Sequence, residues 1–351
     1  MVLCTRGYGG QFIQRQYPHH AMRGFTFAIA LAGLVAASAF NISHEQLLQM
    51  QSASRKAPVL KSSKRPGLQQ PTTASYRPVV LMHGLGDAGS NPGMQSLAQS
   101  VRDAYPGIHA VSVDVADGLA SFLTPMWEQV EQFAAVVRAD PQLAGGFNVV
   151  GLSQGGPVVR GYIEAYNDPP VHRFVSICGV QGGEFNCPLE MQIIPFVCDI
   201  FQDNPYHFLF NGSIPLSFSD YWVDVNFTRY LTGESERSSC NGSHRNTANW
   251  QSLDHLVLIE ATEDTVVYPY QSEQFGGYLP GSTKAVYNYT TWQPYLQDSF
   301  GLKSLFDAGK VTLGSYKGDH LRFSTQYWED TVLPWFNDTM PSTNHGGFLR
   351  G

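Results

Sequence analysis

One serine stands between two glycines in the pentapeptide Gly151-Leu-Ser153-Gln-Gly155, directly after the apolar run FNVV. This G-x-S-x-G pattern is typical of a nucleophile on a sharp strand-to-helix turn, because the residues two before and two after the serine are crowded there. The alternative is a glycine-rich loop that happens to hold a small polar residue. The strand-like run before the motif and the helix-like pattern after it favour a nucleophile, and the chemistry would then be acyl transfer through Ser153.

A serine hydroxyl needs a base at neutral pH, and with this motif an acid and then a histidine follow the serine along the chain. His320, in YKGDHLRF, is the predicted base because it follows the last expected strand. The run HLVLIEA carries or precedes three acids, and Asp264 is preferred over Glu260 and Glu263 because it falls in the turn beyond the strand end. Asp319 adjoins His320 in sequence, and neighbours rarely point the same way, so we expect it to hydrogen-bond the loop backbone.

The oxygen of an attacked carbonyl needs preset donors for its developing negative charge. In turns of this kind one donor is the backbone N–H of the residue after the serine, here Gln154, and the other comes from the loop after an early strand. The stretch MHGLGDAGSNPG, residues 82–93, is expected to form that loop, with the N–H of Leu85 as the second donor. His83 is expected to support this loop rather than transfer protons.

An alternation of strands and helices would position these residues. Apolar runs typical of strands occur at 77–84, 108–115, 147–151, 174–179, 255–261 and 310–316. Helical patterns occur at 92–104, 123–140, 154–166 and 325–336. The sequence therefore predicts an α/β domain over residues 76–336, with a mainly parallel sheet flanked by helices. The alternation breaks over about 180–252, which we expect to be an inserted lid or cap above the carboxyl edge of the strands.

The first 39 residues carry the pattern of a secretory signal peptide, with Met22 as an alternative start. Arg23 is followed by an apolar run and by the small residues Ala37-Ser-Ala39. A membrane anchor is the competing interpretation, but the run from Phe25 to Ala39 is shorter than the ~20 residues a span needs, so we expect no integral span in the mature chain. Residues 40–75 are rich in Gln, Ser and Lys and are expected to be a linker or pro-segment, and 337–351 a C-terminal tail.

Cysteines and glycosylation sequons also indicate the secretory pathway. Cys187 and Cys198 are close in sequence and are candidates for a local disulfide, whereas Cys178, in the run FVSIC, is expected to be a buried free thiol. Cys240 has no evident partner. The candidate glycosylation sites are Asn211, Asn226, Asn241, Asn288 and Asn337.

Composition narrows the classes of function. The chain has 351 residues, of which 43% are hydrophobic, enough for one large domain with a sizeable core or for two small ones. Its formal net charge is −7, and no basic block lies in the region expected to fold, so nucleic acid is excluded as an expected partner. No metal or cofactor is expected either.

Several of these segments together resemble the palmitoyl-protein thioesterases, which are lysosomal α/β-hydrolases, over residues 76–336. The segments are HGLGD with NPG, GLSQGG, the stretch around Asp264 and GDHL, together with SEQFG at 272–276 and GLKSLFDAGKV at 301–311. The family often has tandem cysteines after HGMGD, where this chain has Ala88-Gly89-Ser90. That departure leaves open the disulfide pairing near the oxyanion loop.

The resemblance implies hydrolysis of long-chain fatty acyl thioesters, such as S-palmitoyl cysteine and acyl-CoA-like substrates, through a serine acyl-enzyme. It also implies Ser153 as nucleophile, Asp264 as acid, His320 as base, and the backbone N–H groups of Leu85 and Gln154 as the oxyanion hole. The partners would be S-acylated proteins or peptides, and the location the lysosome or, as an alternative, the extracellular space.

Two other functions stay open at this point: a secreted lipase or carboxylesterase acting on oxygen esters, and a catalytically inactive lipid-binding relative. Aromatic residues of the insertion are candidates for an acyl groove, although most of them are expected to form the core of the insertion itself. They are Phe185, Phe196, Phe201, Phe208, Phe210, Phe218, Tyr221 and Trp222.

Overall fold

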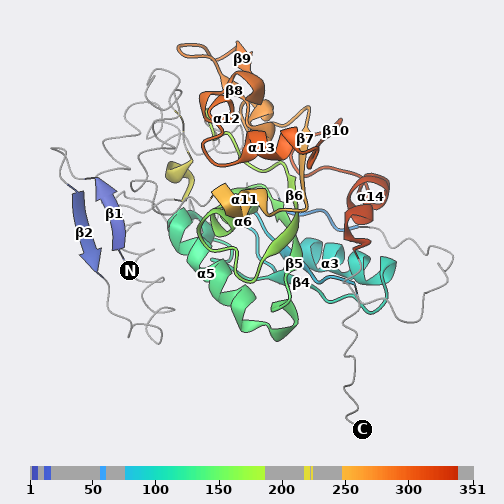
Figure 1. Cartoon of the computed structure of the whole chain (residues 1–351). Coiled ribbons are helices and arrows are strands. Elements are labelled where there is room, and N and C mark those ends of the chain that lie inside the picture. The colour runs from blue at the N-terminus through green and yellow to red at the C-terminus, as the bar shows by residue number, and fades with distance from the viewer. Residues whose placement is uncertain are drawn as a thin grey trace, which may run out of the picture.

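A six-stranded parallel sheet forms the centre of the protein, in a computed structural model that describes residues 2–6, 12–16, 56–60, 76–185, 217–221, 223 and 247–338. The strand order is β10-β7-β6-β5-β3-β4, and every neighbouring pair is parallel. Figure 1 labels all of these strands except β3. The strands are β3 (Val79–Met82), β4 (Ala110–Val113), β5 (Phe147–Leu152), β6 (Val171–Ile177), β7 (His255–Ala261) and β10 (Val311–Tyr316). The predicted α/β fold with a mainly parallel sheet is confirmed.

Alternating side chains of each strand build two cores, one on each face of the sheet. In β3, Val79 and Leu81 belong to one buried cluster, and Val80 and Met82 belong to the other. Because helices cover both faces, every residue of β3 is buried, and the strand therefore reads as a continuous apolar run rather than as alternating polar and apolar residues.

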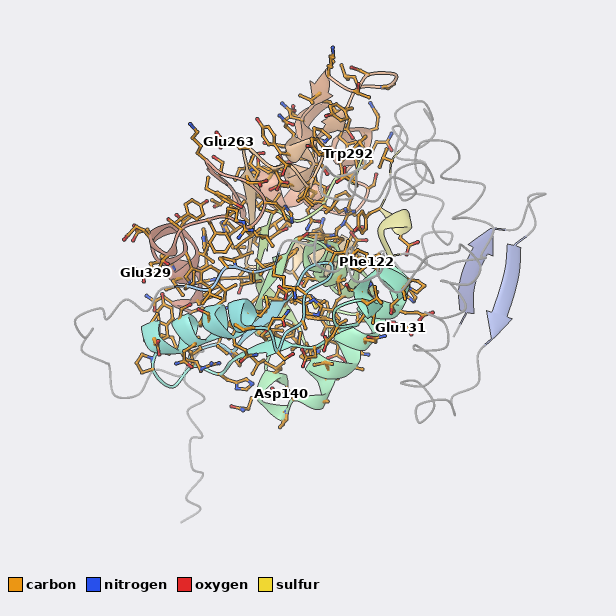
Figure 2. The ribbon with its side chains drawn as sticks, turned by 180° about the vertical axis from the view of Figure 1, so that it is seen from behind. Phe122, Glu131, Asp140, Glu263, Trp292 and Glu329 are labelled. Carbon is orange, nitrogen blue, oxygen red and sulfur yellow. The ribbon has the colours of Figure 1, made fainter. Side chains whose placement is uncertain are left out.

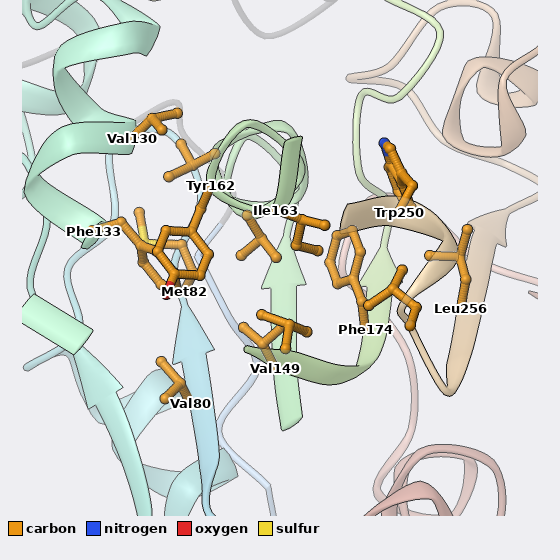
Figure 3. Packing of buried hydrophobic residues seen from close by; sticks show 14 of the residues in the cluster. Val80, Met82, Val130, Phe133, Val149, Tyr162, Ile163, Phe174, Trp250 and Leu256 are labelled. Atoms are coloured by element: carbon orange, nitrogen blue, oxygen red, sulfur yellow. The ribbon is translucent and has the colours of Figure 1, made fainter. Parts of the chain in front are cut away.

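The helices divide between the two faces. One face is covered by α3 (Pro92–Ala104) and by the C-terminal helical segment, residues 325–336. The other face is covered by α5 (Met126–Ala139), α6 (Gly155–Ala165) and the short α11 (Thr247–Gln251). Figure 3 shows the second face, where Tyr162 and Ile163 of α6 pack over the strand residues Val149 and Phe174. The helices predicted at 92–104 and 154–166 are confirmed, and the one predicted at 123–140 begins later, after the single turn α4 (Ala120–Leu123).

The segment predicted to be helical at 325–336 is helical over this range, but its hydrogen-bonding pattern changes along its length. It consists of α14 (Thr325–Tyr327), a wider π-helical turn η6 (Trp328–Val332) and a tighter 3-10 turn η7 (Leu333–Phe336). Pro334 lies in the first turn of η7 and has no N–H to continue the α-helical pattern, so the hydrogen bonding changes there.

A long crossover between β7 and β10 occupies the upper part of Figure 1. Its elements are η4 (Tyr270–Gln274), β8 (Gly277–Tyr278), β9 (Val286–Tyr287), η5 (Tyr289–Thr291), α12 (Gln293–Leu296) and α13 (Leu302–Asp307). In Figure 2, Glu263 and Trp292 lie at this upper end, and Asp140, which precedes β5, lies at the lower end. The crossover therefore lies at the end of the molecule where β7 reaches its carboxyl terminus.

Several predicted segments lie wholly or partly outside the described residues. In the predicted signal peptide, β1 (Val2–Arg6) and β2 (Phe12–Gln16) pair antiparallel with each other, and the apolar run is not among the described residues. In the predicted linker, residues 56–60 contact the domain, because Ala57 is buried and its N–H donates to Asp87. None of the helices in the described part of the chain is both long and apolar enough to cross a bilayer.

The insertion is described only in part. Its described parts are residues 180–185, η3 (Ser217–Asp220), Tyr221, Val223 and residues 247–252, which include α11. Outside the described residues lie Cys187, Cys198, Cys240, Asn211, Asn226 and Asn241. Asn288 and Asn337 are exposed. Cys178 is a buried free thiol, as predicted.

Candidate active site

Ser153 sits on a strained turn between β5 and α6. Its φ of 51° lies in the left-handed region that few side-chain-bearing residues adopt. A Cβ atom at Gly151 would lie 2.8 Å from the carbonyl oxygen of Gly155, and one at Gly155 would lie 2.5 Å from the carbonyl oxygen of His83. Both distances are too short for a side chain, so the turn that presents Ser153 requires glycine at both positions.

Three side chains from distant parts of the sequence meet at this turn. His320 Nε2 lies 2.9 Å from Ser153 Oγ, and His320 Nδ1 lies 2.6 Å from Asp264 Oδ2. Because the carboxylate can only accept, Nδ1 carries a proton, and Nε2 is the ring nitrogen that faces the serine hydroxyl. All three side chains are buried, which removes competing water from these hydrogen bonds.

Asp264 lies in the turn after β7, and the backbone holds its carboxylate. Its Oδ1 accepts the N–H of Val266 at 2.7 Å and of Val267 at 2.8 Å. Burial, the largest influence, raises the pKa of Asp264, but the charge and hydrogen bond of His320 together with the two backbone donors outweigh it and leave the pKa below its usual value. The carboxyl group of Asp264 is therefore ionised, and it orients His320.

The other acids considered from the sequence take different positions. Glu263 has a side chain that is 57% exposed, 3.7 Å from Lys317. Glu260 lies within β7, and burial raises its pKa to about 7. Asp319 Oδ1 accepts the backbone N–H of His320 at 2.8 Å and thereby holds the loop, as expected.

The loop expected to form the oxyanion hole approaches the serine closely. A Cβ atom at Gly84 would lie 2.9 Å from Ser153 Cβ, so the chain one residue before Leu85 nearly touches the turn. His83 supports the loop, because its Nδ1–H donates to the carbonyl of Gly84 at 2.9 Å. The N–H of Gly86 donates to Ser121 Oγ at 2.7 Å. Leu85 is thus held between two fixed neighbours beside the nucleophile.

The segment Ala88-Gly89-Ser90, in the expected oxyanion loop, is held by hydrogen bonds. The N–H of Ser90 donates to Asp114 Oδ1 at 2.9 Å, and the carbonyl of Gly89 accepts from Gln95 Nε2 at 2.7 Å. A Cβ atom at Gly89 would lie 2.4 Å from the carbonyl oxygen of Val113. This close approach to β4 explains why a glycine occupies the position.

The amide side chain of Gln154 connects the turn to the insertion, a contact that the sequence analysis missed. Its Nε2 donates to the carbonyl of Ser121 and to Gln129 Oε1, both at 3.1 Å. Its Oε1 accepts from Ser217 Oγ and from Tyr221 Oη, both at 2.9 Å. The residue expected to matter through its backbone N–H therefore also fixes η3 and Tyr221 against α4 and α5. Nothing in the spacing of these residues signals the contact.

One group of side chains at the site has the donor types of a metal centre. Ligand atoms of Cys178, Asp264 and His320 all lie within 4.8 Å of one another. Asp264 and His320 already share a hydrogen bond of 2.6 Å. Burial raises the pKa of the Cys178 thiol well above its usual value, so the sulfur keeps its proton instead of becoming the thiolate that metals prefer. The donors fit a hydrogen-bonded cluster better than a cation site.

Comparison with known proteins shows the family of the chain. The family model described as palmitoyl protein thioesterase matches residues 78–320. Palmitoyl-protein thioesterase 3 of Dictyostelium discoideum is 32% identical over 276 residues, covering 76% of this chain and 92% of the relative. Lysosomal thioesterase PPT2 of Homo sapiens is 31% identical over 279 residues, covering 76% and 90%. Among solved structures, mature lipase BlEst2 of Bacillus licheniformis has a TM-score of 0.44 and 14% identity over 78% of this chain and 96% of that one. The resemblance noted from the motifs is thereby confirmed: the chain belongs to the palmitoyl protein thioesterase family.

Proposed function

We propose that this chain hydrolyses long-chain fatty acyl thioesters through an acyl-enzyme on Ser153, with His320 as base and Asp264 as its orienting acid. The observation that carries the proposal is the chain of two hydrogen bonds, 2.9 Å from Ser153 Oγ to His320 Nε2 and 2.6 Å from His320 Nδ1 to Asp264. Nucleophile, base and acid are in contact in the order that acyl transfer needs.

In the first half of the reaction, Ser153 Oγ attacks the thioester carbonyl carbon while its proton passes to His320 Nε2. The resulting oxyanion would receive the backbone N–H groups of Leu85 and Gln154. Gln154 directly precedes α6, where no intrahelical carbonyl reaches its N–H. When the C–S bond breaks, the acyl group stays on Ser153 Oγ, and His320 returns the proton to the departing sulfur.

In the second half, water attacks the acyl-enzyme carbonyl and gives its proton to His320. The C–Oγ bond then breaks, the proton returns to Ser153 Oγ, and the fatty acid leaves. A cysteine thiolate, whose conjugate acid has a reference pKa of about 8.5, leaves more easily than an amine. His320 therefore needs to supply less acid catalysis here than in peptide cleavage.

The proposed substrates are S-acylated proteins or peptides and acyl-CoA-like thioesters, and the proposed location is the lysosome. Support comes from relatives named palmitoyl-protein thioesterase and lysosomal thioesterase. Two of the candidate groove aromatics are described: Phe185 is buried against Tyr278, and Tyr221 donates to Gln154. Tyr221 thus joins the insertion to the nucleophile turn, which suits a residue at the acyl end of a bound substrate.

Processing in the secretory pathway is part of the proposal. It comprises removal of residues 1–39, a disulfide between Cys187 and Cys198, and glycosylation at the sequons, of which Asn288 and Asn337 are exposed. Mass spectrometry of the secreted chain before and after enzymatic deglycosylation would identify the mature N-terminus, the modified asparagines and the cross-linked peptide. Unmodified sequons together with an intact residue 1 would overturn this part.

The function is tested by turnover of palmitoyl-CoA and an S-palmitoyl peptide against a matched palmitate oxygen ester, with Ser153→Ala as control. We expect preference for the thioesters and loss of turnover in the variant. A strong oxygen-ester preference would indicate a lipase or carboxylesterase. Failure of the wild type to react with a fluorophosphonate, together with no turnover, would indicate a lipid-binding protein.

A further inference from the structure

A second carboxyl group lies buried behind the acid of the candidate triad. Glu273, in η4, has a side chain with no exposed surface. Its Oε2 accepts the backbone N–H of Ala261, at the end of β7, at 2.9 Å. Within the described part of the chain, no N–H or O–H group donates to its Oε1. The role assigned above to Ser153, His320 and Asp264 does not account for this carboxyl group.

Ala261 connects Glu273 to Asp264, because its N–H donates to Glu273 Oε2 and its carbonyl accepts the N–H of Asp264 at 3.1 Å. The carboxyl of Asp264 and the thiol of Cys178 both influence Glu273. The thiol acts to lower the pKa of Glu273, but burial and the charge of Asp264 outweigh it. Cys178 Sγ also lies 3.1 Å from Tyr316 Oη, a contact in which either atom can donate.

Two adjoining buried carboxyls hold at most one negative charge between them. Asp264 is the better anion because it accepts three N–H groups, from Val266, Val267 and His320. Glu273 accepts one, and burial, followed by the charge of Asp264, raises its pKa well above the usual value. The remaining proton therefore belongs on Glu273, where it can be donated to Asp264.

We propose that Glu273 is a positioning residue of this site, a neutral carboxylic acid that donates a hydrogen bond to the Asp264 carboxylate. The donation stabilises the ionised state of Asp264 and restrains its rotation, so that Oδ2 stays directed at His320 Nδ1. Glu273 touches neither substrate nor the reacting atoms. The inference rests on the proposed role of the triad but not on the identity of the acyl substrate.

Two variants separate the roles that Glu273 could have. In Glu273→Gln the amide can accept from Ala261 and donate to Asp264, so it reproduces the neutral acid. Glu273→Met fills similar space without either hydrogen bond. Glu263→Gln, at an exposed side chain one position before Asp264, is the matched control for removal of a carboxylate.

The test measures, across pH, the rate at which a fluorophosphonate labels Ser153 and kcat/KM for palmitoyl-CoA. We expect Glu273→Gln to keep the wild-type rate and the acid limb of both profiles, as Glu263→Gln does. We expect Glu273→Met to lower both rates by about 10- to 100-fold, by analogy with groups that hold metal ligands in place through hydrogen bonds. An infrared difference spectrum of wild type minus Glu273→Gln should show a protonated carboxyl C=O band at neutral pH.

Two other outcomes would overturn this role of Glu273. If Glu273 is an anion, Glu273→Gln moves the acid limb to lower pH by about one unit and removes no protonated-carboxyl band. If Glu273 only fills space, a folded Glu273→Met reacts at the wild-type rate. Should Glu273→Met fail to fold, the infrared band and the Glu273→Gln profile still decide. The fluorophosphonate reacts with Ser153 without a thioester. If the protein does not hydrolyse thioesters, the labelling rates of the variants therefore still test the role of Glu273.

Discussion

Asp319 Oδ1 lies 2.9 Å from the backbone nitrogen of Thr265 and accepts its N–H. The same oxygen accepts the Thr265 hydroxyl at 2.8 Å and the N–H of His320 at 2.8 Å. One carboxylate oxygen therefore joins the loop that carries His320 to the loop that carries Asp264. Asp319, next to His320 in sequence, therefore connects the two loops. Asp264, 56 positions before His320, is the acid that hydrogen-bonds the imidazole.

Exchanging each acid for its amide should separate these two roles. Asp264→Asn presents an N–H to His320 Nδ1 and favours the wrong tautomer, so kcat for palmitoyl-CoA should fall by about 10³- to 10⁴-fold. Asp319→Asn keeps an oxygen that can accept from Thr265 and His320, so its loss should stay within about tenfold. Equal losses in the two variants, both folded by circular dichroism, would refute this assignment.

The nucleophile turn should not accept even one methyl group. Gly155→Ala places a Cβ atom 2.5 Å from the carbonyl oxygen of His83 and 2.6 Å from that of Met82, and these backbone atoms cannot move aside without displacing β3. Urea unfolding should show a loss of about 1–3 kcal/mol, with activity lost as well. Gly145→Ala is the control, because no atom of the described residues lies within 4 Å of a Cβ there. A Gly155→Ala enzyme as stable and active as Gly145→Ala would contradict the close packing.

The amide of Gln154 should contribute to stability apart from its backbone N–H. Gln154→Met has a similar shape but leaves Ser217 Oγ and Tyr221 Oη without their acceptor and the carbonyl of Ser121 without one of its donors. Unsatisfied buried groups of this kind cost about 1–3 kcal/mol each, so the urea midpoint should fall clearly. Gln99→Met, on the exposed face of α3, should leave it nearly unchanged. Equal midpoints would mean that the insertion is held by other contacts.

The pH dependence of stability should report the proton on Glu273. Its pKa is raised above 4.5 in the folded state, chiefly by burial and then by the charge of Asp264. A raised pKa gives stability that is full below the unfolded value and is lost as pH rises toward the folded one. Glutamine does not titrate, so the Tm of Glu273→Gln relative to wild type should increase from pH 4.5 to neutral pH. A constant difference across calorimetric scans would show that Glu273 is already ionised.

Asp264 should contribute with the opposite sign. Its pKa is lowered from 3.8, since the influence of His320 and the backbone donors exceeds that of burial. The stability it provides is present above 3.8 and is lost as pH falls through the folded pKa. In the same scans, wild type should lose stability below about pH 4 and Asp264→Asn should lose less. An identical acid limb in the two proteins would contradict this sign.

The sequence predicts the parts of the site that are encoded locally. The glycines at 151 and 155 follow from the steric needs of one turn, and α3 begins at Pro92 as its pattern indicates. Asp264 and His320 could be chosen because each follows the carboxyl end of a strand in a parallel sheet, and such ends meet at one edge.

The contacts that sequence reasoning missed join residues with no fixed spacing. Gln154 contacts Ser217, 63 positions later in the sequence. Glu273 lies 120 positions after Ser153, in the segment SEQFG, which does not match a pattern that predicts a catalytic role. Trp328, where the π-helical turn begins, stacks on Phe323, and no local sequence pattern signals either the turn or the contact. Such features depend on tertiary packing and become visible only in the folded chain.

The central claim is that thioester hydrolysis passes through an acyl group on Ser153. It is tested most directly by acid-quenching the purified enzyme during turnover of palmitoyl-CoA and mapping the adduct by mass spectrometry. We predict a palmitoyl ester on the peptide that contains Ser153, formed within the first turnover and absent from Ser153→Ala, which should not turn over. Steady turnover by Ser153→Ala, or an adduct mapped to another residue, would contradict the account.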